Sequence, residues 1–279
     1  MCRLAAYLGP EIFISSLVTE PQYSLIHQSF QAREIEEPLN GDGFGLAWYA
    51  SHESKGPAVF KDITPAWNNH NLLDVARVTQ SSCIFAHVRA ATVGGQVSRS
   101  NCHPFRWKNY TFMHNGTVAG FQKIQRPLRR MLSDEIYDQI NGYTDSEHVF
   151  ALFAENMLKA QDHSDESIKH SLIAAITTIE ELKAQFKIVE GSTMNLVVTN
   201  GKSVTATRYA SKGHKHHSLY YLENRHLDGV LSEDGCEEMS EAAVLIASEP
   251  LGDNQNWKEI PHNHLLQSRR GSQTQIQAI

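Results

Sequence analysis

Short apolar segments bounded by turn residues recur along the chain, and they predict β-strands. The first of them, Cys2 to Leu8, begins almost at the start of the sequence and is closed by Gly9 and Pro10. Several later segments end at Gly, Asn or Asp, which are residues typical of turns between strands. The pattern predicts further strands at 44–49, 83–88, 110–113, 194–199, 203–209, 218–222 and 243–247.

Two longer segments instead carry apolar residues at helical spacing, at 146–159 and 168–186. The first is preceded by Thr144, with Glu147 three residues later, a pattern typical of a capping box at a helix start. Strands and helices come in blocks and do not alternate as regular strand-helix units. Antiparallel sheets covered by helices are therefore favoured over a doubly wound parallel sheet.

Composition describes a globular protein whose length is sufficient to bury a core. The chain has 279 residues, of which 41% are hydrophobic and 20% are charged. We expect one domain over 1–267, followed by a flexible tail over 268–279, because that last stretch is rich in Ser, Gln and Arg. The formal charge of -6 argues against broad nucleic-acid binding.

The expected compartment is the cytoplasm. No apolar run approaches the ~20 residues that a membrane helix needs, and we expect no secretory signal at the start. The 4 cysteines are widely spaced, which favours free thiols in a reducing compartment over a disulfide framework.

Cys2 is the first candidate catalytic residue, because it lies directly behind Met1. Removal of Met1 would leave a cysteine that carries both a thiol and a free α-amine. An α-amine has an ordinary pKa of about 7.7–8.0, so it is a usable base at neutral pH. Nucleophile and base would then belong to one residue. The alternative for Cys2 alone is a small buried strand residue.

Four further segments strengthen the catalytic interpretation by their order along the chain. Each has a structural explanation when it is taken alone: an ordinary turn, a surface arginine, a hairpin or a helix cap. The segments are Gly-Asp-Gly-Phe-Gly at 41–45, His-Val-Arg-Ala-Ala-Thr at 87–92, His-Asn-Gly at 114–116 and Thr-Asp-Ser-Glu at 144–147.

Together these segments resemble the class II glutamine amidotransferases, a branch of the N-terminal nucleophile hydrolases. The resemblance implies that Cys2 is the nucleophile and that Arg89 holds the α-carboxylate of the substrate. It implies that Asn115 and Gly116 form the oxyanion hole and that Asp145 binds the α-amino group. The stretch Asn-Cys-His-Pro-Phe at 101–105 is similar to an N-x-H-P stretch of the same family.

The implied fold is α+β, a four-layer αββα sandwich with two facing and mostly antiparallel sheets. The opening MCRLAAYLGP and the late LIASEPL segment make the chain similar to the stand-alone members, among them γ-glutamyl hydrolases of ergothioneine synthesis and glutathione-degrading proteins. A separate synthase domain has no room in the sequence. We therefore expect hydrolysis of a γ-glutamyl amide bond through a Cys2 thioester, and the alternative is a glutaminase or regulatory subunit that depends on a partner synthase or peptidase.

The chemistry also holds when each residue is considered by itself. An arginine such as Arg89 can grip a carboxylate with two parallel hydrogen bonds, whereas Asp145 offers the opposite charge to an ammonium group. The Asn115 amide and the Gly116 N–H can donate to an oxyanion. Thr92, a support for Arg89 or the thiol, and His114 complete the predicted substrate-binding set.

Other features are expected to be structural. The histidines His214, His216 and His217 are predicted to lie in a solvated loop, so that we expect no metal site and no cofactor. The remaining thiols, at Cys83, Cys102 and Cys236, are expected to be structural. The expected partner is a small γ-glutamyl substrate, with a homodimer or a partner synthase or peptidase left open, and neither nucleic acid nor membrane is expected to bind.

Overall fold

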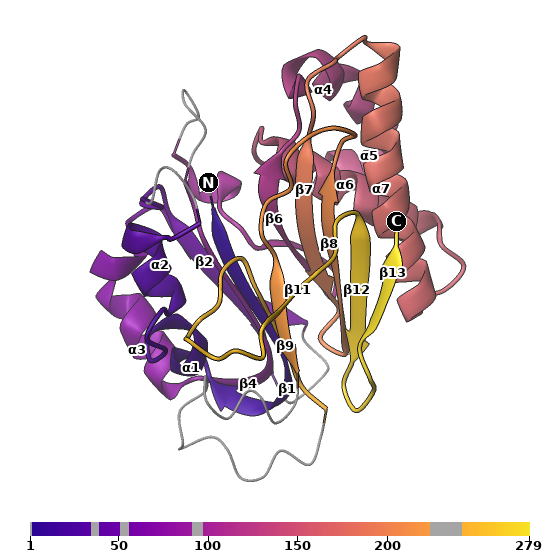
Figure 1. Cartoon of the computed structure of the whole chain (residues 1–279). Helices are drawn as coiled ribbons and strands as arrows, with labels where there is room; N and C mark the ends of the chain where they lie inside the picture. Colours follow the sequence, from indigo (N-terminus) through magenta and orange to yellow (C-terminus); the bar gives the residue numbers. More distant parts are fainter. Residues whose placement is uncertain (1, 35–38, 51–55, 91–96, 224–241) are drawn as a thin grey trace.

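Two β-sheets face each other, and helices cover the outer side of each (Figure 1). The computed structural model describes residues 2–34, 39–50, 56–90, 97–223 and 242–279. Helices α1 to α3 lie outside one sheet, and α4 to α7 lie outside the other (Figure 1). This arrangement confirms the predicted four-layer αββα sandwich. No helix among the described residues has the length and apolar character needed to cross a bilayer.

The first sheet has seven strands in the order β11-β9-β10-β1-β4-β2-β3. Strand β1 lies near its middle and pairs antiparallel with β10 and β4, so that the start of the chain is held on both sides. The strands are β1 (Arg3–Phe13), β2 (Phe44–Tyr49), β3 (Pro57–Asp62), β4 (Gln80–Val88), β9 (Tyr220–Glu223), β10 (Val244–Ala247) and β11 (Lys258–Glu259).

The second sheet has six strands in the order β13-β12-β8-β7-β6-β5. Residues 268–279, expected as a flexible tail, form the end of β12 and the edge strand β13, which pairs antiparallel with β12. The prediction failed because the strand forms by hairpin pairing with the adjacent strand β12 and not through strong apolar patterning of its own. The strands are β5 (Phe105–Trp107), β6 (Tyr110–Thr117), β7 (Thr193–Thr199), β8 (Ser203–Ala210), β12 (His264–Arg269) and β13 (Gln275–Ala278).

The described residues form three apolar clusters, and the helices enclose two of them. One cluster lies between α1 to α3 and the first sheet, and a second lies between α4, α6, α7 and the second sheet. The third fills the space between the sheets and includes Leu4, Phe85, Met113 and Val197. The helices are α1 (Ser15–Val18), α2 (Leu25–Gln31), α3 (His70–Val78), α4 (Phe121–Arg129), α5 (Asp134–Tyr137), α6 (Asp145–Lys159) and α7 (Asp165–Gln185).

The capping box predicted at Thr144 is only half formed. The Thr144 hydroxyl accepts a hydrogen bond from the Glu147 N–H at 3.2 Å, as predicted for an N-cap. The Glu147 carboxylate does not return to Thr144 and instead accepts from the backbone N–H groups of Asn141 and Gly142 at 2.9 and 2.7 Å. The same carboxylate therefore orders the turn that leads into α6.

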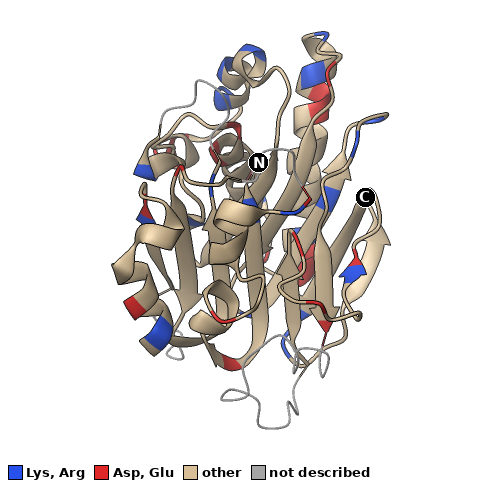
Figure 2. Ribbon diagram, turned by 60° about the vertical axis from the view of Figure 1, so that its left-hand side comes forward, with Lys and Arg blue, Asp and Glu red and all other residues tan. Residues whose placement is uncertain are grey.

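Charged side chains belong mainly to the outer helices and loops. Figure 2 shows acidic and basic positions interspersed over these outer segments. The cluster between the sheets is apolar, with Leu4, Ala6 and Leu8 from β1 facing Met113 and Val197 from the other sheet. Polar side chains that enter the space between the sheets, where β1 begins, are therefore exceptions with a specific cause.

Candidate active site

Cys2 lies at the start of β1 and faces the space between the two sheets. Alternate residues of this strand, Leu4, Ala6 and Leu8, belong to the inter-sheet cluster, so Cys2 shares their face. The side chain is partly buried, and its sulfur donates to the Ala90 carbonyl at a Sγ–O distance of 3.6 Å. Burial raises the pKa of the Cys2 thiol, while the Ala90 backbone, the N-terminal charge, Arg89 and Arg3 act to lower it. A base is therefore needed to form the thiolate at neutral pH.

Arg89 follows the neighbouring strand β4 and is 6% exposed. Its backbone is held by the Gly-Asp-Gly turn, because Arg89 N–H donates to Gly43 O at 2.8 Å and Asp42 N–H donates to Arg89 O at 2.9 Å. Arg3 and Val88 are paired across β1 and β4. Cys2, just before β1, therefore lies beside Arg89, just after β4. Arg89 therefore contacts the turn at Asp42 and Gly43 directly.

Asn115 approaches the same place from the opposite sheet. It lies on the inner face of β6, next to Met113 of the inter-sheet cluster, and is 1% exposed. Its Nδ2 donates to Ser248 Oγ at 3.2 Å, and Leu4 N–H donates to the same oxygen at 3.1 Å. Asn115 is therefore joined through one oxygen to β1, the strand that Cys2 directly precedes.

Gly116 occupies a position where no side chain fits. A Cβ at this residue would overlap the carbonyl oxygen of Thr193 on β7 and would lie 2.6 Å from His114 Nε2. Both Asn115 and Gly116 lie within β6 and not beyond its end, because the strand continues to Thr117. The His-Asn-Gly hairpin considered from the sequence is therefore absent.

Asp145 is the first residue of α6 and lies beside the end of β6. Its Oδ2 accepts from Val118 N–H at 2.7 Å, and its Oδ1 accepts from Ser146 N–H at 2.8 Å. These bonds fix the carboxylate two residues beyond Gly116. The helix thus positions the carboxylate next to the predicted oxyanion hole.

His114 does not take the substrate-binding position expected of it. Since side chains alternate along a strand, it points to the helical side of β6, opposite to Asn115. Its ring nitrogens contact Ser146 Oγ at 2.9 Å and Thr193 O at 3.1 Å, and the residue is 1% exposed. His114 therefore joins β6 to α6 and β7. Thr92, the remaining predicted substrate residue, lies outside the described residues.

Sequence reasoning missed two polar residues that belong to this end of the sandwich. Ser248 follows β10 and is 0% exposed. Asn195 on β7 is paired across the strands with Asn115, is also 0% exposed, and its Nδ2 donates to Ser218 O at 2.9 Å. Ser248 belongs to the LIASEPL segment, whereas no local motif marks Asn195. Its importance follows only from the strand pairing.

A buried ion pair lies immediately behind the nucleophile, on the opposite face of β1. Arg3 and Glu249 are separated by 3.5 Å from Nε to Oε1, and their side chains are 1% and 4% exposed. Glu249 also accepts from the backbone N–H groups of Arg33 and Glu34 at 2.9 and 3.1 Å. Arg3 is thus anchored by Glu249, and Leu4 is anchored by Ser248.

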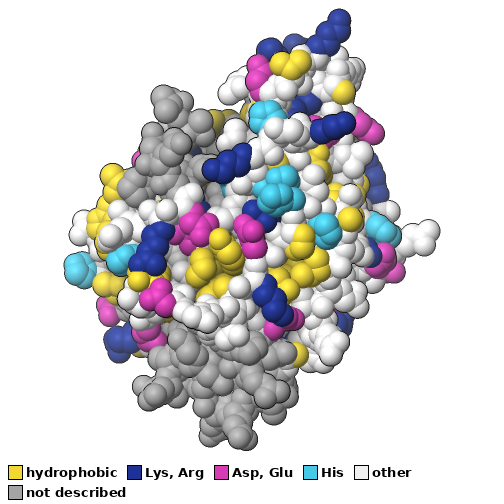
Figure 3. Space-filling view, viewed as in Figure 1, with side chains coloured by type: hydrophobic (Ala, Val, Ile, Leu, Met, Phe, Trp, Pro, Cys, Tyr) yellow, Lys and Arg dark blue, Asp and Glu magenta, His cyan; other side chains and the backbone are white. Residues whose placement is uncertain are grey.

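The histidine-containing segment at 214–217 is more firmly attached than the expected solvated loop. His214 Nε2 accepts from Gly191 N–H at 2.8 Å, and His216 contacts Asn263 Oδ1 at 2.8 Å while stacking on His262. Figure 3 shows histidine side chains gathered on this face of the molecule. No group of three or more potential metal ligands occurs within the part of the chain that the structure describes.

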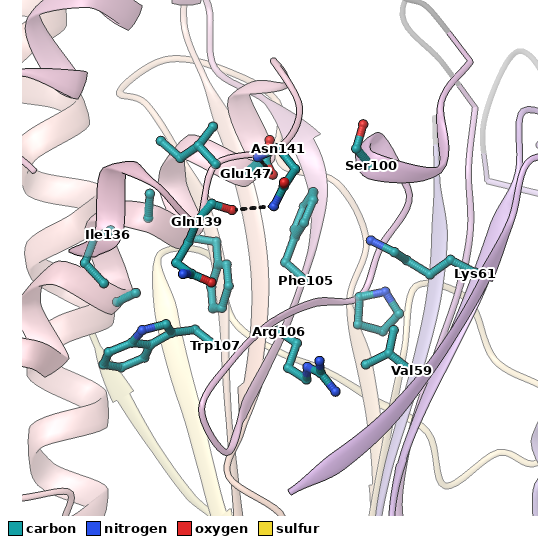
Figure 4. A pocket seen from close by; sticks show the side chains of 15 residues that line it. Val59, Lys61, Ser100, Phe105, Arg106, Trp107, Ile136, Gln139, Asn141 and Glu147 are labelled. Atoms are coloured by element: carbon teal, nitrogen blue, oxygen red, sulfur yellow. Dashed lines mark hydrogen bonds between the residues drawn. The ribbon is translucent and has the colours of Figure 1, made fainter. Parts of the chain in front are cut away.

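A separate cavity lies between β3, β5 and the α5–α6 region (Figure 4). It measures about 380 Å³, and its lining includes Lys61, Phe105, Arg106, Trp107 and Glu147. None of the predicted catalytic or substrate-binding residues lines it. The cavity is therefore distinct from the group formed by Cys2, Arg89 and Asn115.

Comparison with known proteins identifies the family. A sequence model of the class II glutamine amidotransferases matches residues 11–278. The chain belongs to this family. It is 36% identical to the probable glutamine amidotransferase DUG3 of Saccharomyces cerevisiae, over 95% of this chain and 81% of that protein. It is 26% identical to the γ-glutamyl-hercynylcysteine sulfoxide hydrolase of Mycobacterium tuberculosis, over 96% of this chain and 92% of that protein.

Solved class II amidotransferase structures share the fold. A glutamine aminotransferase class-II domain protein from Silicibacter pomeroyi aligns with a TM-score of 0.69 and 24% identity, over 99% of both chains. The glutamine phosphoribosylpyrophosphate amidotransferase of Bacillus subtilis aligns with a TM-score of 0.63 and 12% identity, and 99% of this chain covers 49% of that one. The family and the αββα architecture predicted from the sequence are both confirmed.

Proposed function

We propose that this class II amidotransferase hydrolyses the γ-glutamyl amide bond of a small substrate, with Cys2 as the nucleophile. The observation that carries the proposal is the meeting of three chain segments at one end of the sandwich. Cys2 directly precedes β1, Arg89 directly follows the adjacent strand β4, and Asn115 is tied to β1 through Ser248. The relatives named for glutamine amidotransfer and γ-glutamyl hydrolysis support the same reaction class.

In the proposed reaction, removal of Met1 frees the α-amine of Cys2. The amine accepts the thiol proton, directly or through a water, and the sulfur attacks the γ-carbonyl carbon. The Asn115 amide and the Gly116 N–H would donate to the resulting oxyanion, and losing one such donor typically costs ~10²–10³ in rate. Collapse breaks the C–N bond, the leaving nitrogen takes the proton from the ammonium, and water then hydrolyses the thioester to glutamate.

Substrate recognition is assigned to the two opposite charges beside this centre. Arg89 would bind the α-carboxylate of the γ-glutamyl group, and Asp145 would bind its α-ammonium. Asp145 already accepts two backbone N–H groups, so a substrate ammonium would complete its hydrogen bonding. Because the described cysteines Cys2, Cys83 and Cys102 are free thiols, we place the enzyme in a reducing compartment.

The test is glutamate release from a panel containing glutamine, glutathione and γ-glutamyl-p-nitroanilide. Wild type should release glutamate from at least one of them, and Cys2→Ala should reduce the rate to background. Cys83→Ala is the matched control, because it removes a fully buried thiol from the far part of the inter-sheet cluster. Equal activity of wild type and Cys2→Ala, or a mature protein that retains Met1 by mass spectrometry and is active, would overturn the proposal.

A further inference from the structure

Ser248 is the point at which the two halves of the proposed site are joined. It follows β10 directly, and its backbone N–H donates to Leu4 O at 3.0 Å as a continuation of the pairing with β1. Its Oγ accepts two hydrogen bonds, one from Leu4 N–H at 3.1 Å and one from Asn115 Nδ2 at 3.2 Å. A single hydroxyl oxygen therefore bridges the first sheet and the second.

The bond from Asn115 decides how its amide is oriented. The terminal torsion of an asparagine side chain is broad, so the amide rotates easily when nothing holds it. The Asn115 Oδ1 is buried and has no hydrogen-bond partner among the residues that the structure describes. Within the described part of the chain, the hydrogen bond from Nδ2 to Ser248 is therefore the one that the Asn115 side chain makes. An amide nitrogen has two hydrogens, so the second remains available to an oxyanion.

Ser248 is itself fixed from two sides. Ser218 Oγ donates to the Ser248 carbonyl oxygen at 2.9 Å. The next residue, Glu249, is held by the buried ion pair with Arg3 at 3.5 Å. Ser248 thus has little freedom to move away from Asn115, and its position is set by the same strand that carries Cys2.

We propose that Ser248 is a positioning residue that orients the Asn115 amide toward the oxyanion and fixes its place relative to the Cys2 strand. The inference rests on the proposed function, because it assigns Asn115 to the oxyanion hole. Ser248 acts through Asn115 and contacts no reacting atom. Its effect should therefore appear in the chemical step and not in binding of the γ-glutamyl group, which is assigned to Arg89 and Asp145.

The first experiment measures kcat and KM for the best γ-glutamyl substrate of the panel. Ser248→Ala should lower kcat about 10–100-fold and leave KM within about 3-fold of wild type, since an interaction that acts only in the transition state lowers kcat. Ser81→Ala is the matched control. It removes a buried serine hydroxyl that likewise accepts from a backbone N–H, that of Cys83 at 3.1 Å, but it lies at the end of β4 away from Arg89, so kcat should stay within about 2-fold of wild type.

A double-mutant cycle with Asn115→Ala separates positioning from a general structural role. Once the Asn115 amide is gone, the additional change Ser248→Ala should lower kcat by less than about 2-fold, because the two residues act as one unit. If Ser248→Ala lowers kcat in the Asn115→Ala background by as much as it does in wild type, the proposal is overturned. Wild-type kcat in Ser248→Ala would overturn it as well.

Ser248→Ala leaves the buried Leu4 N–H without its acceptor, so a second variant guards against misfolding. Ser248→Cys, assayed with a reductant, keeps the side-chain volume but offers only a weak acceptor, and should lower kcat about 3–10-fold. An unchanged kcat in Ser248→Cys would contradict the proposal. If activity does not depend on Cys2 at all, the proposed function fails together with this inference. Activity that needs Cys2 but not the Ser248 hydroxyl refutes the role of Ser248 alone.

Discussion

His148 should make the stability of the protein fall in mild acid. The residue is 0% exposed and lies in the first turns of α6. Its Nε2 accepts from Arg129 Nε at 2.8 Å, and its Nδ1 lies 2.7 Å from Thr144 O, so the ring is held in a neutral form. Burial lowers the pKa of His148 to about 4, and Arg129 contributes in the same direction. Protonation would remove the acceptor of Arg129 and place two cations side by side.

The sign and size of the change in unfolding free energy with pH follow from proton linkage. The unfolded chain binds a proton at this histidine below its ordinary pKa of 6.5, whereas the folded chain does so only near pH 4. The stabilisation is therefore complete above pH 6.5 and is lost as the pH falls through the interval from 6.5 to about 4. Between pH 7.5 and 5.5 the loss is about 1.3 kcal/mol, and by pH 4 it is about 2.9 kcal/mol.

Urea unfolding of wild type and His148→Gln at several pH values between 7.5 and 5.5 measures this contribution. Other buried histidines, such as His87 with its pKa lowered to about 3 by burial, destabilise both proteins equally in acid. The difference in unfolding free energy should therefore shrink by about 1.3 kcal/mol over the interval. His70→Gln, at an exposed residue of α3, serves as the control and should run parallel to wild type. Parallel curves for wild type and His148→Gln would refute the reasoning.

Three further substitutions test other parts of the site. Arg89→Lys should raise KM at least ~10-fold in a steady-state assay, with a smaller change in kcat, because Lys cannot form the paired hydrogen bonds to a carboxylate. Gly116→Ala should lower the melting temperature and abolish glutamate release, because its Cβ would overlap the Thr193 carbonyl. Glu249→Gln should destabilise by about 3–5 kcal/mol in urea unfolding, because it leaves the buried Arg3 charge without a counter-charge. These expectations would be contradicted by an unchanged KM in Arg89→Lys, an unchanged melting temperature in Gly116→Ala or an unchanged unfolding midpoint in Glu249→Gln.

Strands with strong local apolar patterning could be predicted, and edge strands could not. The segment predicted at 44–49 matches β2, and 194–199 matches β7 within one residue. In contrast, β13 is short and carries only two apolar residues, Ile276 and Ala278, and it was predicted to be a flexible tail. Its formation depends on hairpin pairing with β12, which is itself held in the sheet by β8 on its other side. The length of β6 was underestimated for a similar reason, since the polar pair His114 and Asn115 interrupts its apolar run.

Side-chain direction decides which of the predicted site residues face one another. The order of the motifs indicates that Cys2, Arg89 and Asn115 come together, but it does not say which face of a strand each residue occupies. The one-residue alternation along β6 places Asn115 between the sheets and His114 against α6, so that neighbouring motif residues have different roles. Asn195 was missed because only the register of β7 against β6 places it opposite Asn115.

The anchors around the start of β1 fix the position of Cys2, the proposed nucleophile, which directly precedes the strand. A chain terminus is ordinarily among the most mobile parts of a protein. Here Arg3 is held by a buried carboxylate on one face, and Leu4 is held by Ser248 at the strand edge, where Asn115 also binds. Both anchors come from consecutive residues, 248 and 249. A change in that dipeptide should therefore disturb the oxyanion donor and the nucleophile together, which connects a late segment of the sequence to chemistry at its second residue.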